Sequence, residues 1–246
     1  MPLAKDPISP PDRGPFRRRV ALTFDDGPRP GTTDRILDVL LRRGLKATFF
    51  ITGERLTSSA GRGLVKRMIA EGHMVGNHGE RHINLKDPKV AVAAVREGRA
   101  RLESLVPSDA LWWFRFPYGQ ASVASMQAVE DEGHAVVGWH VDSADWCYAS
   151  PTGGVGVCHP STFKWTDDEH RGDMPANIIA QAATFDGGIA LMHDTHKYTA
   201  DTLDDVVTAL AYATFGFTWL DDVQVFPKLN QQAVALGRRA GPVLLG

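Results

Sequence analysis

The feature that most constrains the fold is the alternation of short apolar runs with segments of helical periodicity along most of the chain. The runs expected to form strands are Val20–Phe24, Ala47–Ile51, Met74–Asn77, Trp113–Phe116, Ala135–His140, Gly188–Met192 and Phe217–Leu220. The segments expected to form helices are Thr33–Arg43, Leu64–Glu71, Pro88–Leu105, Ser122–Glu132, Pro175–Phe185 and Thr202–Phe215. Strands that alternate with helices are typical of parallel βα units. The strand runs are also continuously apolar, as in strands covered on both faces, so we predict a barrel-like α/β fold.

The length of the chain suits one such domain. Barrels of about 200–250 residues often form a single unit, and this chain has 246 residues. We predict one domain over residues 17–230. Residues 1–16 contain five prolines and no apolar core of an export signal, so they are expected to be a flexible lead. Residues 147–172, rich in Gly, Pro and Ser, are expected to be an insertion that is functional or flexible, and residues 231–246 a C-terminal tail.

Composition excludes several classes of protein. Hydrophobic residues make up 43% and charged residues 23%, which is ordinary for a globular chain. The formal net charge is −2, without the basic field of a nucleic-acid-binding protein. No apolar run approaches the roughly 18 residues of a membrane span. Cys147 and Cys158 both lie in the insertion, which has little apolar core to hold it; we expect a disulfide between them, with two buried thiols as the alternative.

Polar side chains gather where the expected strands end. In parallel α/β barrels the active site lies at the C-terminal ends of the strands. The polar clusters at these ends are Thr23–Pro28, His78–His82, Arg115–Gly119, Asp142–Trp146 and Leu191–Asp194. The barrel prediction therefore brings all of these clusters to one mouth.

These clusters contain the parts of a metal-dependent hydrolase. His78 and His82 are four residues apart, a spacing that places both rings on one face of a helical turn. With a carboxylate from Asp25 or Asp26 they form a ligand set that suits zinc or a similar divalent metal and leaves positions open for water. The other carboxylate is a candidate general base, and His193 is a candidate general acid.

Neighbouring groups could support this chemistry. Asp145 could orient His193 and raise the pKa of its ring through its negative charge. Arg115 could hold the base carboxylate, and backbone N–H groups near Tyr118 and Gly119 could stabilise an oxyanion. The set is suited to metal-assisted hydrolysis of an amide or an ester.

These five motifs, in this order, resemble those of the polysaccharide deacetylase family, also called carbohydrate esterase family 4. The resemblance covers roughly Val20 to Leu220. It implies a distorted (β/α)7-type barrel in a single domain, which holds Zn²⁺ or another divalent transition metal. It also implies an acetylated glycan as substrate, with removal of N-acetyl groups from the GlcNAc residues of peptidoglycan or a chitin-like polymer and release of acetate. Export to the periplasm, cell envelope or exterior is expected from such a substrate, although the sequence displays no signal.

The resemblance also implies a role for each motif residue. These roles are catalytic base for Asp25; metal ligands for Asp26, His78 and His82; base-positioning residue for Arg115; oxyanion donor for the Tyr118 N–H; catalytic acid for His193, with Asp145 as its partner; and wall and floor of the acetylated-sugar pocket for Trp146 and Leu191. One position departs from the pattern, because Gly79 stands where the family has Ser or Thr. A hydrogen bond that steadies the metal-binding loop is therefore expected to be absent, a loss that typically costs about 10–100-fold in affinity or activity.

Other functions remain open at this point. The same residues are compatible with an esterase acting on O-acetylated polysaccharide, or with an amide hydrolase acting on a small molecule, because both reactions pass through a tetrahedral intermediate. A non-catalytic glycan-binding module is a third reading, which the intact base and acid oppose. The residues without an assigned role are expected to order loops (Asp142), to cap or support the site (Asp194) or to be exposed in a loop (His196).

Overall fold

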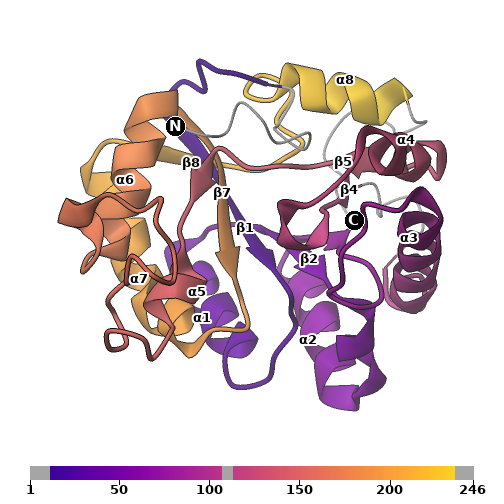
Figure 1. The fold of residues 1–246 in the computed structure, drawn as a ribbon, viewed down its shortest axis with the longest axis horizontal. Coiled ribbons are helices and arrows are strands. Elements are labelled where there is room, and N and C mark those ends of the chain that lie inside the picture. The colour runs from indigo at the N-terminus through magenta and orange to yellow at the C-terminus, as the bar shows by residue number, and fades with distance from the viewer. Residues whose placement is uncertain (1–11, 107–112, 236–246) are drawn as a thin grey trace.

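The computed structural model describes residues 12–106 and 113–235, which fold around one sheet of parallel strands (Figure 1). The strands are β1 Arg19–Asp25, β2 Thr48–Ile51, β3 Met74–Asn77, β4 Trp113–Phe114, β5 Ala135–Val136, β6 Val141–Asp142, β7 Gly187–His193 and β8 Gly216–Thr218. Their order is β5-β4-β3-β2-β1-β7-β6, and β8 pairs with the first half of β1. Within the described ranges no strand pair joins β5 to β6, so the barrel is open there. The predicted α/β barrel fold is confirmed.

Helices connect the strands and cover the outside of the sheet (Figure 1). The α-helices are α1 Thr33–Arg43, α2 Ser59–Ala70, α3 Pro88–Leu102, α4 Val123–Asp131, α5 Asp145–Tyr148, α6 Met174–Phe185, α7 Lys197–Tyr212 and α8 Pro227–Ala235; short 3₁₀ helices are η2 Gly53–Thr57, η4 Pro117–Gly119 and η5 Asp168–His170. Local sequence sets several boundaries. The Asp87 carboxylate accepts from two backbone N–H groups at the start of α3, and Gly44 ends α1 in the left-handed conformation.

The prediction of one strand over Ala135–His140 is wrong. This stretch forms β5, which pairs with β4, and the chain then crosses to β6, which pairs with β7. Between them, the carbonyls of Val137 and Gly138 accept hydrogen bonds from the buried Arg115 guanidinium instead of a neighbouring strand. A side chain therefore satisfies the backbone at the open seam of the barrel.

The core lies on both faces of the sheet. Val20, Leu22 and Phe24 of β1 pack toward the helices, whereas Ala21 belongs to a cluster inside the barrel with Phe16. Every β1 residue after Arg19 is buried, as expected for a strand covered on both faces.

The described parts of the two chain ends are packed against the domain. Phe16 is fully buried, and the Asp12 carboxylate accepts from the N–H groups of Lys228 and Leu229 at the start of α8. Of the expected lead only residues 12–16 are described, and of the expected tail only residues 231–235, which belong to α8. In the part of the chain that the structure describes, no helix is both long and apolar enough for a membrane crossing.

The topology places the candidate residues at one end of the sheet. β1 and β7 are adjacent and parallel over their whole length, and their register pairs Asp25 with His193. β3 and β4 end before His78 and Arg115, and β6 ends at Asp142. The predicted disulfide between Cys147 and Cys158 is present. It closes the first part of the insertion, directly after Asp145 and Trp146.

Candidate active site

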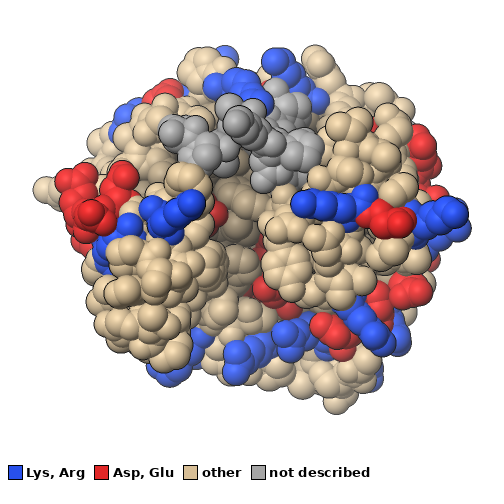
Figure 2. Space-filling model, in the orientation of Figure 1, with Lys and Arg blue, Asp and Glu red and all other residues tan. Residues whose placement is uncertain are grey.

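A cleft of about 520 Å³ lies at the C-terminal ends of the strands. It is lined by side chains from all five polar clusters that the sequence singled out, among them Asp25, Asp26, His78, His82, Tyr118, Trp146, Leu191 and His193. Arg115 and Asp145 are fully buried behind this lining and touch it through hydrogen bonds. On the face of the molecule that Figure 2 shows, acidic and basic side chains are interspersed, without a broad field of either sign.

Asp25, at the end of β1, is held by a buried arginine. Arg115 Nη1 donates to Asp25 Oδ1 at 2.8 Å and to the Thr23 hydroxyl at 2.8 Å. Asp25 is 3% exposed, and the Arg115 guanidinium also lies over the Phe50 ring. Burial lowers the pKa of Arg115, while the charge of Asp25 acts in the opposite direction. The arginine thus fixes the carboxylate in one orientation and keeps a positive charge beside it.

Asp26, His78 and His82 present ligand atoms to one point. Asp26 Oδ1 lies 3.2 Å from His78 Nε2 and 3.3 Å from His82 Nε2, and no other cluster of this kind occurs among the described residues. Asp26 has a positive φ of 77° in the turn that follows β1. The expectation that the two histidines share a helical turn is wrong, because residues 78–82 form an irregular bend after β3. The bend nevertheless brings both rings to the same carboxylate oxygen.

This group fits a divalent metal. Asp26 Oδ1 is buried and lacks a hydrogen-bond donor in the described structure. His78 Nδ1 donates to the Arg115 carbonyl at 2.8 Å; since a carbonyl only accepts, the proton sits on Nδ1 and the Nε2 lone pair faces Asp26. In the metal-free protein, burial would raise the pKa of Asp26, but the interactions with His78, His193 and His82 hold it well below its ordinary value. One carboxylate and two imidazoles therefore stand ready as ligands.

The loop that carries His78 and His82 is steadied without a hydroxyl at position 79. The Gly79 N–H donates to Asn77 Oδ1 at 2.8 Å, and Asn77 Nδ2 donates to the Val95 carbonyl of α3 at 2.9 Å. The carbonyls of Gly79 and Glu80 accept from the first two N–H groups of η2. Asn77 thus links the loop to α3 directly after β3. The effect of Gly79 on activity remains a prediction.

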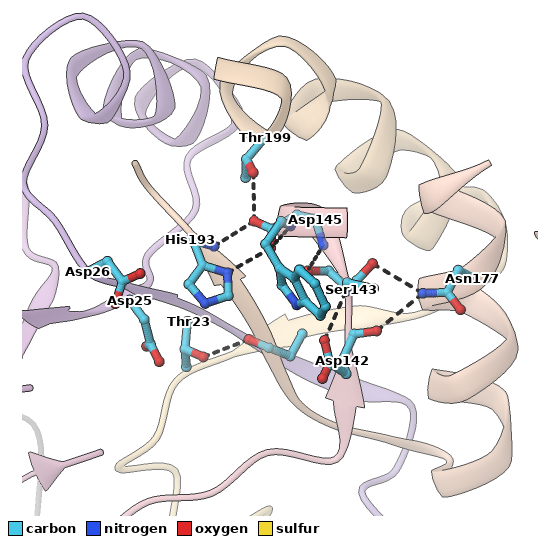
Figure 3. A network of polar contacts seen from close by, with 12 residues as sticks. Thr23, Asp25, Asp26, Asp142, Ser143, Asp145, Asn177, His193 and Thr199 are labelled. Atoms are coloured by element: carbon cyan, nitrogen blue, oxygen red, sulfur yellow. Dashed lines mark hydrogen bonds and ion pairs between the residues drawn. The ribbon is translucent and has the colours of Figure 1, made fainter. Parts of the chain in front are cut away.

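His193, at the end of β7, is held by Asp145. Figure 3 shows its ring between Asp145 on one side and Asp25 and Asp26 on the other. His193 Nδ1 lies 2.7 Å from Asp145 Oδ1, and the His193 N–H donates to Asp145 Oδ2 at 2.7 Å. Thr199 of α7 also donates to Oδ2, at 2.6 Å. Because the carboxylate only accepts, Nδ1 carries a proton, and Nε2 is the ring nitrogen left to exchange a proton with a bound molecule.

The electrostatics of this pair favour the protonated ring. Burial would lower the pKa of His193, but the charge and hydrogen bond of Asp145, with the charges of Asp26 and Asp25, raise it to about 10. Burial would raise the pKa of Asp145, but the charge and hydrogen bond of His193 hold it below its ordinary value. In the metal-free protein, His193 is therefore a cation at neutral pH.

Aromatic and apolar side chains form the walls of the cleft. Tyr118 adopts a left-handed conformation, with φ of 59°, and its exposed ring lies edge-on to His82, 4.2 Å between centroids. Leu191 of β7 and Trp146 of α5 line the cleft, and Trp146 packs against Phe163 of the insertion. Two other aromatic residues of this region do not line the cleft: Tyr148 is buried and Trp165 is exposed.

Several cleft residues escaped sequence reasoning. The expectation that His196 is simply exposed is wrong, because it is half-buried and its ring lies 5.6 Å from that of His193. Trp139 and Phe163 also line the cleft. Trp139 lies in the stretch that was expected to be one strand and instead crosses the open seam of the barrel, and Phe163 lies in the insertion, which has no periodic pattern. Asp194, expected as a support, is fully buried, and burial raises its pKa to about 7.

Comparisons with known proteins agree with this geometry. Residues 13–137, about half of the chain, match the family model described as polysaccharide deacetylase. The chain belongs to the polysaccharide deacetylase family. This membership agrees with the resemblance carried by the five motifs and with the α/β barrel.

Several relatives of this chain are named as deacetylases of acetylated glycans. The chain is 34% identical over 210 residues to the peptidoglycan-N-acetylglucosamine deacetylase PgdA of Listeria monocytogenes, an alignment that covers 84% of this chain but only 39% of that protein. It is 37% identical over 138 residues to a chitooligosaccharide deacetylase of Rhizobium leguminosarum bv. phaseoli, which covers 55% of this chain and 59% of that protein. The crystal structure of the Bc1960 peptidoglycan N-acetylglucosamine deacetylase matches with a TM-score of 0.69 and 28% identity, over 87% of this chain and 91% of that chain.

Proposed function

We propose that this chain is a metal-dependent deacetylase that hydrolyses the N-acetyl groups of GlcNAc residues in peptidoglycan or a chitin-like glycan and releases acetate. The observation that carries the proposal is the convergence of three arrangements in one cleft: a carboxylate held by a buried arginine, an Asp-His-His group and an imidazole held by a buried carboxylate. Metal-assisted hydrolysis of an amide requires a base, a cation and an acid of this kind.

Asp26, His78 and His82 are the proposed metal ligands. One carboxylate and two imidazoles suit Zn²⁺ or another divalent transition metal. When bound, such a metal polarises the acetyl carbonyl and lowers the pKa of an adjacent water. The Arg115 carbonyl supports these ligands indirectly: it accepts a hydrogen bond from His78 Nδ1 and so fixes the tautomer of His78.

Asp25 is the proposed general base, and it takes a proton from the attacking water. Arg115 holds this carboxylate in place through a hydrogen bond to one of its oxygens, Oδ1. The backbone N–H of Tyr118 is the proposed hydrogen-bond donor to the developing oxyanion. Trp146 and Leu191 are the proposed wall and floor of the pocket that receives the acetylated sugar, since both line the cleft.

His193 is the proposed general acid, with its Nε2 proton going to the departing amine. Burial would lower the pKa of the ring, but Asp145 raises it and so favours the protonated form, and Asp145 also holds the ring by its other nitrogen. An amine must be protonated to leave, whereas an alcohol leaves more readily. This difference favours an amide over the O-acetyl ester of the alternative reading.

The proposal extends to the biological setting of the chain. A peptidoglycan or chitin-like substrate lies outside the cytoplasm, so we propose that the domain acts after export, in the cell envelope or outside the cell. The chain spans about two fifths of the length of the Listeria relative. We propose residues 17–230 as the catalytic unit, with residues 147–172 as an insertion at the rim of its cleft.

Acetate release tests the function directly. The zinc-loaded protein is incubated with peptidoglycan and with chitooligosaccharides, and acetate is measured beside a sample treated with a chelator. Chelator-sensitive acetate from either glycan supports the proposal, and the better substrate distinguishes cell wall from chitin. Acetate from O-acetylated xylan alone would favour the esterase, and no acetate from any substrate would contradict the proposal.

A further inference from the structure

A buried pair of side chains joins the segment after His193 to the loop that follows Asp25. Asp194 is fully buried, and so is Thr33, the first residue of α1. Thr33 Oγ1 donates to Asp194 Oδ2 at 2.6 Å and accepts from the Arg29 N–H at 2.8 Å. The Asp194 N–H donates to the Asp25 carbonyl at 3.3 Å. The pair therefore connects the two segments that carry the proposed acid and the proposed base, although neither side chain takes part in the proposed reaction.

The Asp194 carboxyl also lies directly against Gly27, the residue after Asp26. A Cβ atom at Gly27 would lie 2.0 Å from Asp194 Oδ2 and 2.2 Å from Oδ1, which no side chain tolerates. On the β2 side of the turn, the Gly27 carbonyl accepts from the Thr52 N–H at 3.1 Å. The Asp25–Gly27 turn is thus held between the Asp194 carboxyl and the end of β2.

A second hydrogen bond joins the same two segments and so restricts their rotation about the Thr33–Asp194 contact. Arg29 Nη1 donates to the Thr195 carbonyl at 2.8 Å, so the loop is tied to two consecutive residues after His193. These hydrogen bonds support an arrangement of Asp26, His78 and His82 that tolerates little displacement. Asp26 Oδ1 lies within 3.3 Å of both His78 Nε2 and His82 Nε2, and a displacement of about 1 Å at a reacting site can cost on the order of 100-fold in rate.

We propose that Asp194 is a positioning residue, whose buried carboxyl holds the Asp25–Gly27 turn through Gly27 and Thr33 and so sets the placement of Asp25 and Asp26 relative to His193. The effect on turnover rests on the proposed function. The effect on metal binding does not, because it concerns only the placement of Asp26 against the two histidines.

Three substitutions test the Asp194–Thr33 contact. Asp194→Ala and Thr33→Val remove it from either side, and we expect each to weaken Zn²⁺ binding by about 10–100-fold and to lower kcat by a similar factor. Asp194→Asn keeps both the size of the side chain and an oxygen that can accept from Thr33, so we expect its zinc affinity and kcat to stay near those of the wild type. Zinc dissociation constants come from competition with a chromogenic chelator, and kcat from acetate release.

Thr218→Val is the matched control. The Thr218 hydroxyl donates to Asp222 Oδ2 at the same 2.6 Å, and Thr218 is buried in β8, outside the cleft. This variant loses a similar hydrogen bond and is expected to lower Tm without changing zinc affinity or kcat. It separates a loss of general stability from a loss of positioning.

Gly27→Ala probes the steric contact independently. Its added Cβ collides with the carboxyl atoms of Asp194, and Asp194→Ala removes those atoms. We therefore expect Gly27→Ala to weaken zinc binding strongly in the wild-type background and less in the Asp194→Ala background. Additive losses would contradict direct contact between the two positions.

The outcomes are distinguishable from failure of the proposed function. If Thr33→Val and Asp194→Ala lower Tm as Thr218→Val does but leave zinc affinity unchanged, the inference is overturned. Equal losses in Asp194→Asn and Asp194→Ala also overturn it, since the asparagine retains the acceptor and the shape. If Asp194→Ala does not fold, the zinc affinity and kcat of Thr33→Val and Asp194→Asn still test the inference. A wild-type protein that binds zinc but releases no acetate would count against the proposed function alone, while zinc affinity would still test the role of Asp194.

Discussion

Replacing Asp145 with asparagine should lower the pKa of His193 toward that of an ordinary histidine. The carboxylate of Asp145 accepts from His193 Nδ1, from the His193 N–H and from Thr199, each within 2.7 Å. Asp145→Asn has the same size but removes the negative charge, which is the main cause that raises the pKa of His193 against the opposing effect of burial.

The structure sets the size of this effect. The pKa of His193 is raised from 6.5 to about 10 in the metal-free protein. At about 1.4 kcal/mol for each pH unit, this corresponds to roughly 5 kcal/mol in favour of the protonated ring. A neighbouring opposite charge typically contributes about 1–3 pH units, and Asp25 and Asp26 remain in the variant. We therefore expect the pKa of His193 to fall by about that much in Asp145→Asn.

The assay is an NMR titration of the histidine rings in metal-free wild type and variant. His134 is an internal control, because burial lowers its pKa to about 4 and its surroundings do not include Asp145. A wild-type His193 that titrates near pH 6.5, or a variant in which its pKa does not move, would refute the reasoning.

The same shift makes a prediction for stability. A group whose pKa is higher in the folded state contributes stability that is fully present below its unfolded pKa and is lost as the pH rises through its folded pKa. The contribution of His193 should therefore be present below about pH 6.5 and lost as the pH rises through about 10. Denaturant unfolding of the metal-free protein should show this decline in the wild type and a smaller one in Asp145→Asn.

Three further substitutions test other parts of the site. Asp25→Asn should retain zinc but lose about 10²–10⁴-fold in turnover, since it cannot take a proton; full activity by acetate release would refute its role as base. His82→Ala should lower the zinc content found by elemental analysis, whereas His159→Ala, which removes an exposed histidine of the insertion, should not. Arg115→Met leaves the Asp25 carboxylate buried and unpaired, and should cost about 3–5 kcal/mol in the free energy of unfolding. Arg96→Met, which breaks an exposed pair with Glu132, should cost no more than about 1 kcal/mol, and similar losses in the two variants would contradict the burial argument.

Most of the architecture and the proposed site could be predicted because the relevant signals are local. A continuously apolar run followed by Asp25 and Asp26 reveals both a buried strand and the polar cluster at its end. Parallel pairing then requires such clusters to meet, so the histidines after β3 and at the end of β7 could be placed at the same end of the barrel without knowledge of any contact.

Contacts made by packing between distant segments could not be predicted in this way. The run from Ala135 to His140 reads as one strand, and only the Arg115 guanidinium, which satisfies its carbonyls, shows why it divides. The pairing of Thr33 with Asp194 and the position of His196 likewise depend on how α1 and α7 pack beside β7. Such side chains carry no periodicity that distinguishes them from ordinary loop or cap residues.

The register of β1 with β7 has a consequence for how the protein is made. Asp25 and His193 are neighbours across two adjacent strands, yet β2 to β6 lie between them along the chain, so Asp25 is synthesised well before His193. A nascent chain that has emerged only through β6 already contains Asp25, Asp26, His78, His82 and Arg115, but it lacks both the acid and the strand that covers that edge of β1. Long-range parallel pairing of this kind is slow to form because the loop must close before its contacts contribute. The site proposed for hydrolysis is therefore complete only after β7 has joined the barrel, and partly folded chains that lack this pairing are expected to be inactive.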